Sequence, residues 1–138
     1  MKTVLCFGTF DGLHPGHLSY LRQAKKQGDK LVVIVARDET VKQVKGYLPE
    51  LNQAKRTFAV QSIPMVDLTT VGYPGDKYKV IEEVKPDIIC LGYDQQAFTE
   101  DLKEKLAQRG LKVKILRMKA FKPEIYKSSK IKERQQRK

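Results

Sequence analysis

The chain has 138 residues, 41% of them hydrophobic, which is enough to bury the core of one domain without disulfides or structural metals. Its formal net charge of +11 is uneven: residues 111–138 carry +9 and the preceding 110 residues only +2. We expect neither a signal peptide nor a membrane span, because the chain starts directly with a strand pattern and no apolar stretch approaches about 20 residues.

The first predicted element is a short apolar run, Thr3 to Phe7, with the length and composition of a buried strand. A glycine-containing loop follows, and then the string His14-Pro15-Gly16-His17. Pro15 suits the first position of a helix, where its missing N–H would have no partner in any case. His14 then lies at or beside the helix cap and His17 about one turn further on, where free amides and the helix dipole favour an anion. The sequence therefore predicts a phosphate site.

Four other interpretations of this stretch stand beside the phosphate site. The glycines at Gly8, Gly12 and Gly16 match neither the dinucleotide-binding pattern nor the Walker P-loop, since no Gly-Lys-Ser/Thr follows. A metal site on His14 and His17 is weaker, because no third ligand is suggested nearby. The two histidines could also be a capping residue and a helix residue without any chemistry.

The rest of the chain alternates between helix and strand patterns. The continuous aliphatic run Leu31–Ala36 indicates a strand covered on both faces, as in a parallel sheet. After the helix that Gly28 ends, the predicted elements are strand 31–36, helix 40–46, helix 49–63, strand 65–68, loop 69–76, helix 78–84, strand 87–91, helix 98–109, strand 113–116 and a final helix from about 128. This alternation favours a Rossmann-like, doubly wound α/β fold: one domain over 1–138, with a five-stranded parallel sheet in a three-layer α/β/α sandwich and a basic C-terminal helix or tail at 128–138.

Two features of the composition bear on compartment and partners. Cys6 and Cys90 both fall within strand patterns, so we expect reduced core residues in a cytoplasmic protein. The basic C-terminal segment is compatible with nucleic-acid binding, with a polyphosphate substrate or with a solvated helix. The charge alone does not choose between these three.

In doubly wound sheets, ligands bind beyond the carboxyl ends of the strands, where the strand order reverses. If the order is 3-2-1-4-5, the first and fourth strands are neighbours. The loops carrying Thr9–His17 and Gly92–Gln95 would then face each other across one crevice. Their convergence supports a nucleotide site at this edge.

Four segments occur in the order in which they occur in small cytidylyltransferase-like proteins: Gly8–His17, Ala36–Asp38, Leu91–Gln95 and Tyr126–Ile131. The first resembles the HxGH signature of the nucleotidyltransferase superfamily, and the third makes the chain most similar to the archaeal-type FAD synthases. The resemblance implies transfer of AMP from ATP to FMN, giving FAD and pyrophosphate. The alternatives are a cytidylyltransferase that uses CTP and glycerol 3-phosphate or a similar phosphorylated alcohol, and a nucleotide- or RNA-binding module without catalysis.

The resemblance also implies roles for individual residues. His14 and His17 would be catalytic. The expected nucleotide-binding residues, which include both histidines, are Thr9, Phe10, His14, Pro15, Gly16, His17, Gly92, Tyr93, Asp94, Tyr126, Ser128 and Ser129. A homodimer is compatible with this family, and nucleic acid is not the expected partner.

Cations near the site are candidates for the β- and γ-phosphates of the triphosphate. They are Lys42 and Lys45, which share one face of a short helix, and Arg56. On the helix predicted over 49–63, residues 51, 54, 58 and 59 would face inward and Arg56 a different side. A divalent ion, Mg²⁺ by expectation, would bridge those phosphates. Asp11 could contact it, or could be a loop-forming residue.

Overall fold

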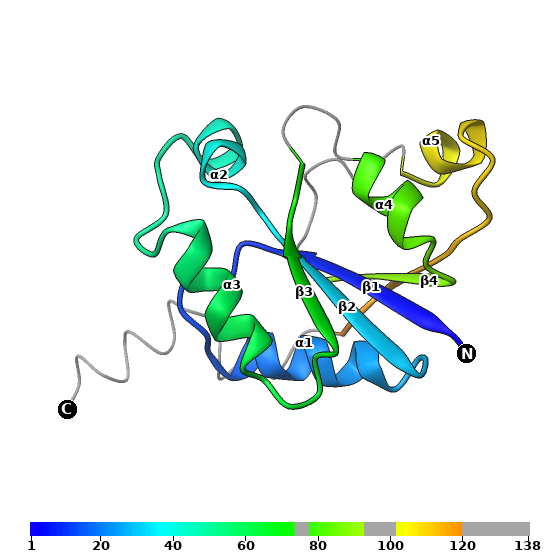
Figure 1. The fold of residues 1–138 in the computed structure, drawn as a ribbon, viewed down its shortest axis with the longest axis horizontal. Helices are drawn as coiled ribbons and strands as arrows, with labels where there is room; N and C mark the ends of the chain where they lie inside the picture. The colour runs from blue at the N-terminus through cyan, green and yellow to red at the C-terminus, as the bar shows by residue number, and fades with distance from the viewer. Residues whose placement is uncertain (74–77, 93–101, 120–138) are drawn as a thin grey trace.

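The computed structural model describes residues 1–73, 78–92 and 102–119 (Figure 1). The strands are β1 (Thr3–Gly8), β2 (Lys30–Val35), β3 (Leu68–Val71), β4 (Ile88–Leu91) and β5 (Lys114–Arg117). The helices are α1 (Pro15–Lys25), α2 (Asp38–Lys45), α3 (Gln53–Gln61), α4 (Lys79–Val84) and α5 (Leu102–Gln108). The predicted alternation of strands and helices is confirmed. The third strand was placed wrongly: only Leu68 of the predicted 65–68 is in β3. The helix expected from about 128 lies outside the described residues, and none of the described helices is long and apolar enough to cross a membrane.

The sheet is parallel throughout and has the order β3-β2-β1-β4-β5, as predicted. The central strand β1 pairs with β2 on one side and with β4 on the other, which aligns Cys6 with Cys90. Both cysteines are buried free thiols. Burial raises the pKa of Cys90 to about 11 and that of Cys6 further still, so both are protonated packing residues.

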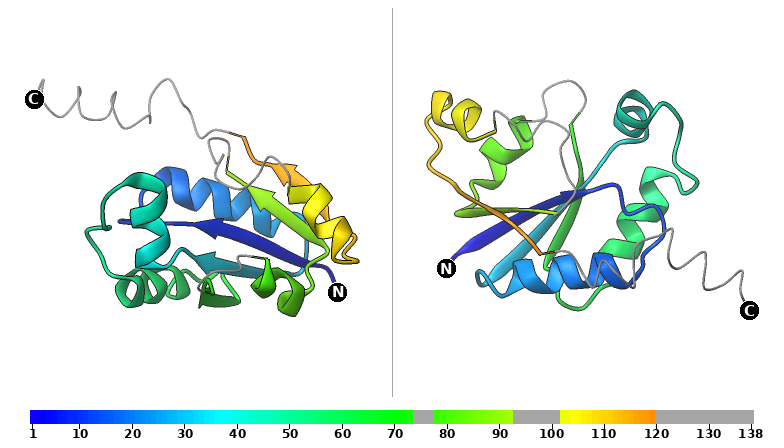
Figure 2. Two further views of the ribbon diagram at one scale, coloured as in Figure 1. Left: turned by 90° about the horizontal axis from the view of Figure 1, so that it is seen from above. Right: turned by 180° about the vertical axis from the view of Figure 1, so that it is seen from behind.

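Side chains of successive strand residues pack on opposite faces of the sheet, and each face has its own core. On one face Val4 and Cys6 of β1 pack with Leu21 and Ala24 of α1 and with residues of α3 such as Val60. On the other face the strands pack against α4 and α5, in a cluster built from Leu5, Phe7, Val32, Ile34, Val80, Ile81, Ile89, Leu91, Leu102 and Leu106. Figures 1 and 2 show the sheet between these two helix layers. The predicted three-layer sandwich is confirmed.

Candidate active site

The start of α1 has a capping arrangement built from two histidines. His14 is the N-cap residue, and its Nδ1 accepts a hydrogen bond from the Gly16 amide at 3.0 Å. His17 lies three residues further on, and its Nδ1 accepts from the His14 amide at 3.3 Å. The two imidazole rings stack with centroids 3.8 Å apart. An imidazole whose Nδ1 accepts a hydrogen bond carries its proton on Nε2 when neutral, so each ring supplies an Nε2–H donor.

Gly16 is required by the packing of this cap rather than by its backbone angles. A Cβ added at Gly16 would lie 2.8 Å from Cε1 and 3.0 Å from Nδ1 of His14. The His14 ring occupies that space because it accepts the Gly16 amide hydrogen. The glycine of the HxGH string therefore allows the first imidazole to fold over the helix end.

Replacing Gly16 with alanine should lower turnover by about 10- to 100-fold without lowering thermal stability, because small displacements of reacting groups carry costs of this size. Alanine is better than glycine in a helix by about 1 kcal/mol, which offsets the loss of a cap hydrogen bond of similar size. Steady-state kinetics and thermal unfolding of the same preparation check both parts. Unchanged turnover would show that the His14 ring tolerates the shift.

The loop between β1 and α1 has a constrained backbone. Phe10 has a positive φ of 54°, which a non-glycine residue rarely adopts, and Gly12 has a φ of 90°. The Phe10 ring is 2% exposed, folds back over Gly8 and lies 5.3 Å from the His17 ring. The Phe10 side chain is therefore part of the core, and the loop offers its backbone at this position.

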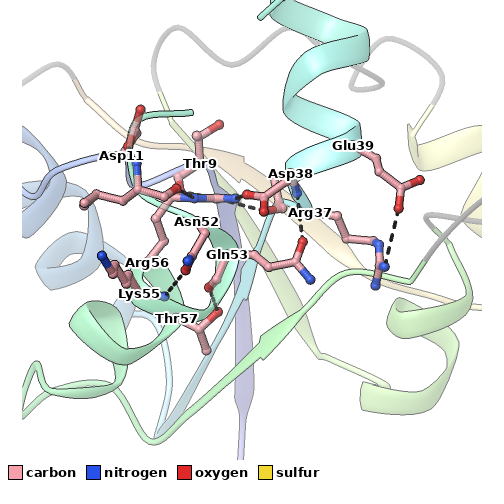
Figure 3. A network of polar contacts seen from close by, with 12 residues as sticks. Thr9, Asp11, Arg37, Asp38, Glu39, Asn52, Gln53, Lys55, Arg56 and Thr57 are labelled. Carbon is pink, nitrogen blue, oxygen red and sulfur yellow. Dashed lines mark hydrogen bonds and ion pairs between the residues drawn. The ribbon is translucent and has the colours of Figure 1, made fainter. Parts of the chain in front are cut away.

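Arg56 differs most from the sequence prediction. Its side chain is fully buried, whereas Phe58, which was expected to face inward, is 75% exposed. The guanidinium donates to the carbonyl oxygens of Thr9, Ala36 and Leu51 and pairs with the Asp38 carboxylate (Figure 3). The hydrogen bonds and the ion pair of this guanidinium are all made inside the protein, so the geometry gives no support to the predicted role of Arg56 as a ligand of the β- and γ-phosphates.

Asp11 has the loop-forming role that the sequence left open. Its two carboxylate oxygens accept hydrogen bonds from the amides of Glu50 and Leu51 at 2.8 and 2.9 Å. The bond from the Leu51 amide, the bond from the Glu50 amide and the positive charges of Arg56 and Lys45 lower the pKa of the Asp11 carboxyl. Asp11 thereby ties the β1–α1 loop to the segment before α3.

The two lysines of α2 are both exposed. The charge of Lys45 acts on Asp11, so this lysine lies within electrostatic range of the histidine-bearing loop. Lys42 lies one helical turn earlier. Its backbone carbonyl accepts a hydrogen bond from the amide of Gly46, the residue that caps the C-terminal end of α2. Of the three cations predicted to bind phosphates, the two lysines remain candidates.

Gly92 directly follows β4, which is paired with β1, so the loops after the two strands begin at the same edge of the sheet. The Gly92 carbonyl accepts a hydrogen bond from Arg117 at 2.8 Å. The other predicted nucleotide-binding residues, Tyr93, Asp94, Tyr126, Ser128 and Ser129, lie outside the described residues.

Two residues at this edge have roles that the sequence did not assign. The Tyr20 hydroxyl donates to the Cys90 carbonyl at 2.6 Å and lies 3.2 Å from the Phe7 carbonyl. This side chain of α1 therefore contacts both β1 and β4. Asp38 is the carboxylate partner of Arg56 at 2.6 Å. The sequence signal for Tyr20 is that its ring carries a hydroxyl although it lies on the apolar side of α1. For Asp38 the signal is its place in the segment Ala36–Asp38, which is one of the four that carry the family resemblance.

Comparison with known proteins shows the family of the chain. A family model described as cytidylyltransferase-like matches residues 5–134. The chain is 47% identical over 121 residues to the FAD synthase of Aciduliprofundum boonei, which covers 88% of this chain and 80% of that protein. It is 46% identical over 136 residues to the FAD synthase of Ferroglobus placidus, with 97% and 88% covered.

Solved structures show the same fold. The lipopolysaccharide core biosynthesis protein from Thermoplasma volcanium GSS1 superposes with a TM-score of 0.83 at 42% identity, over 88% of this chain and 98% of that one. The pantoate-beta-alanine ligase from Francisella tularensis shares the fold alone, with a TM-score of 0.63 at 17% identity over 85% of this chain and 58% of that one. With the family match over almost the whole length and these relatives, the chain belongs to the cytidylyltransferase-like family.

Proposed function

We propose that this protein is an FMN adenylyltransferase, which transfers AMP from ATP to FMN and releases FAD and pyrophosphate. The observation that carries the chemistry is the pair of stacked imidazoles capping α1 at the edge where β1 and β4 end. The choice of ATP and FMN is supported by relatives at 40–47% identity that are named FAD synthase.

The reaction needs positioning and charge stabilisation more than covalent help from the protein. A phosphate oxygen of FMN attacks the α-phosphorus of ATP in line. The new P–O bond forms as the bond between the α-phosphorus and the oxygen bridging to the β-phosphate breaks, and pyrophosphate leaves. Negative charge grows on the non-bridging oxygens and on the leaving group. The Nε2–H groups of His14 and His17, at a helix N-terminus, would donate to those oxygens.

Cations would complete the site. Lys42 and Lys45 are the proposed partners of the β- and γ-phosphates. Mg²⁺ is the proposed metal, and when bound it would neutralise phosphate charge. In the described part of the chain no three metal-binding side chains form a cluster, which fits an ion held mostly by phosphate oxygens and water. Asp11 is the candidate protein ligand, since each of its oxygens keeps a lone pair beyond the one hydrogen bond given above.

A substrate matrix tests the proposal. The protein is incubated with ATP or CTP and with FMN or glycerol 3-phosphate, and the products are measured by mass spectrometry together with released pyrophosphate. FAD formed only from ATP and FMN is the expected result. CDP-glycerol from CTP would instead assign a cytidylyltransferase. Salt-dependent oligonucleotide binding without any pyrophosphate would assign a binding module.

Two further properties belong to this proposal. A cytoplasmic location is supported by two cysteines that are free thiols within the core. A homodimer is compatible with the family resemblance, and light scattering on the purified protein measures it directly.

A further inference from the structure

The starting observation is a fully buried guanidinium at the edge of the candidate active site. The Arg56 side chain is 0% exposed, and no other charged side chain in the described part of the chain is buried. A charge in the protein interior is stable only when hydrogen bonds and an opposite charge replace its water shell. Its partners therefore show what the residue holds together.

These partners come from four separate segments. Nη1 donates to the Thr9 carbonyl, directly after β1, and to the Ala36 carbonyl, directly after β2, both at 2.8 Å. Nε donates to the Leu51 carbonyl, before α3, at 2.9 Å. Nη2 pairs with Asp38, the first residue of α2, at 2.6 Å. Figure 3 shows the guanidinium between Thr9 and Asp38.

A second contact joins two of the same segments. The Asp11 carboxylate binds the amides of Glu50 and Leu51, while Arg56 binds the carbonyls of Thr9 and Leu51. The β1–α1 loop is thus attached to the segment before α3 through a carboxylate on one side and a guanidinium on the other. Among protein side chains, only the planar guanidinium of arginine offers several N–H donors in fixed directions, as these contacts of Arg56 require.

The loop needs such attachment because of its backbone. The Thr9 carbonyl belongs to the peptide that enters Phe10, the residue with a φ of 54°. Fixing this carbonyl fixes the plane of the peptide ahead of an unfavourable conformation, which persists only where surrounding contacts determine it. The loop then leads directly to His14 and the start of α1.

We propose that Arg56 is a positioning residue: its buried guanidinium holds the loop of Thr9–His17 in the conformation that receives the nucleotide phosphates, without binding them. The kinetic part of this inference rests on the proposed function. The structural part, that Arg56 fixes the loop conformation, concerns the protein without substrates and does not depend on the proposed function.

Arg56→Lys tests the proposal because it keeps the positive charge and removes the planar guanidinium with its several N–H donors. In the free protein we expect amide hydrogen exchange of peptides covering 9–13 and 47–52 to rise by roughly 10-fold or more, while peptides within β2 stay unchanged. With ATP and FMN we expect kcat to fall by about 10- to 100-fold and KM for ATP to stay within about threefold, since positioning acts on the transition state.

Lys55→Ala is the matched control, an exposed neighbour on α3, and should leave exchange and kinetics unchanged. If Arg56→Lys does not fold, Asp38→Asn, which keeps one acceptor oxygen, should raise exchange in the same two segments to a smaller extent. Unchanged exchange in 9–13 with a raised KM for ATP and wild-type kcat would overturn the proposal and make Arg56 a phosphate ligand. A uniform rise that includes β2 would overturn it in favour of global stabilisation. The exchange result stands even if the wild-type protein makes no FAD.

Discussion

Replacing His17 with alanine is expected to lower turnover by about 10²- to 10³-fold, the scale for losing one hydrogen-bond donor to the transition state. The ring is stacked on His14 at 3.8 Å and lies in the first turn of α1, where the helix dipole favours a bound phosphate. The strand and the core helices do not depend on the imidazole. The variant should therefore fold, and the loss should appear in kcat under saturating ATP and FMN.

The same side chain also completes the helix cap, so lost capping must be separated from lost chemistry. His17→Gln is the matched variant, because glutamine three residues after the cap residue is a usual partner in a capping box and can accept from the His14 amide. We expect His17→Gln to restore the thermal unfolding midpoint without restoring turnover. Near wild-type turnover in either variant would remove the His17 imidazole from the mechanism.

The sequence predicts the fold well because its signals here are local. Strands covered on both faces appear as unbroken aliphatic runs, as in Leu31 to Val35, all of which are at most 3% exposed. Pro15 between two histidines marks a helix start, and the structure places His14 at the cap and His17 one turn on. The neighbouring β1 and β4 then follow from the topology that such alternation favours.

The parts of the site that the sequence does not reveal depend on contacts between distant segments. An arginine on a surface helix is ordinarily exposed, and nothing near Arg56 indicates that carbonyls 47, 20 and 5 residues away converge on it. Asp11 shows the same limit, since its amide partners lie about 40 residues ahead. Phe58 is exposed for no reason that the described contacts explain.

Replacing Leu5 with alanine is expected to lower the free energy of unfolding by about 2 to 5 kcal/mol, the usual cost of a cavity at a fully buried leucine. Leu5 is 0% exposed in the central strand and belongs to the core between the sheet and the α4–α5 layer. A loss of this size is a large part of the roughly 5 to 15 kcal/mol that stabilises a typical domain. The thermal midpoint should fall by roughly 10 to 20 °C.

Leu68→Ala is the matched control, because it makes the same chemical change in edge strand β3 at a side chain that is 46% exposed. Its cost should stay below about 1 kcal/mol. Leu5 faces the layer opposite α1, so Leu5→Ala assayed well below its midpoint should keep near wild-type kcat, in contrast to His17→Ala. Urea unfolding of both leucine variants, followed by circular dichroism, provides the comparison. Equal losses in the free energy of unfolding at the two positions would mean that the core between the sheet and the α4–α5 layer is less tightly packed than the burial of Leu5 indicates.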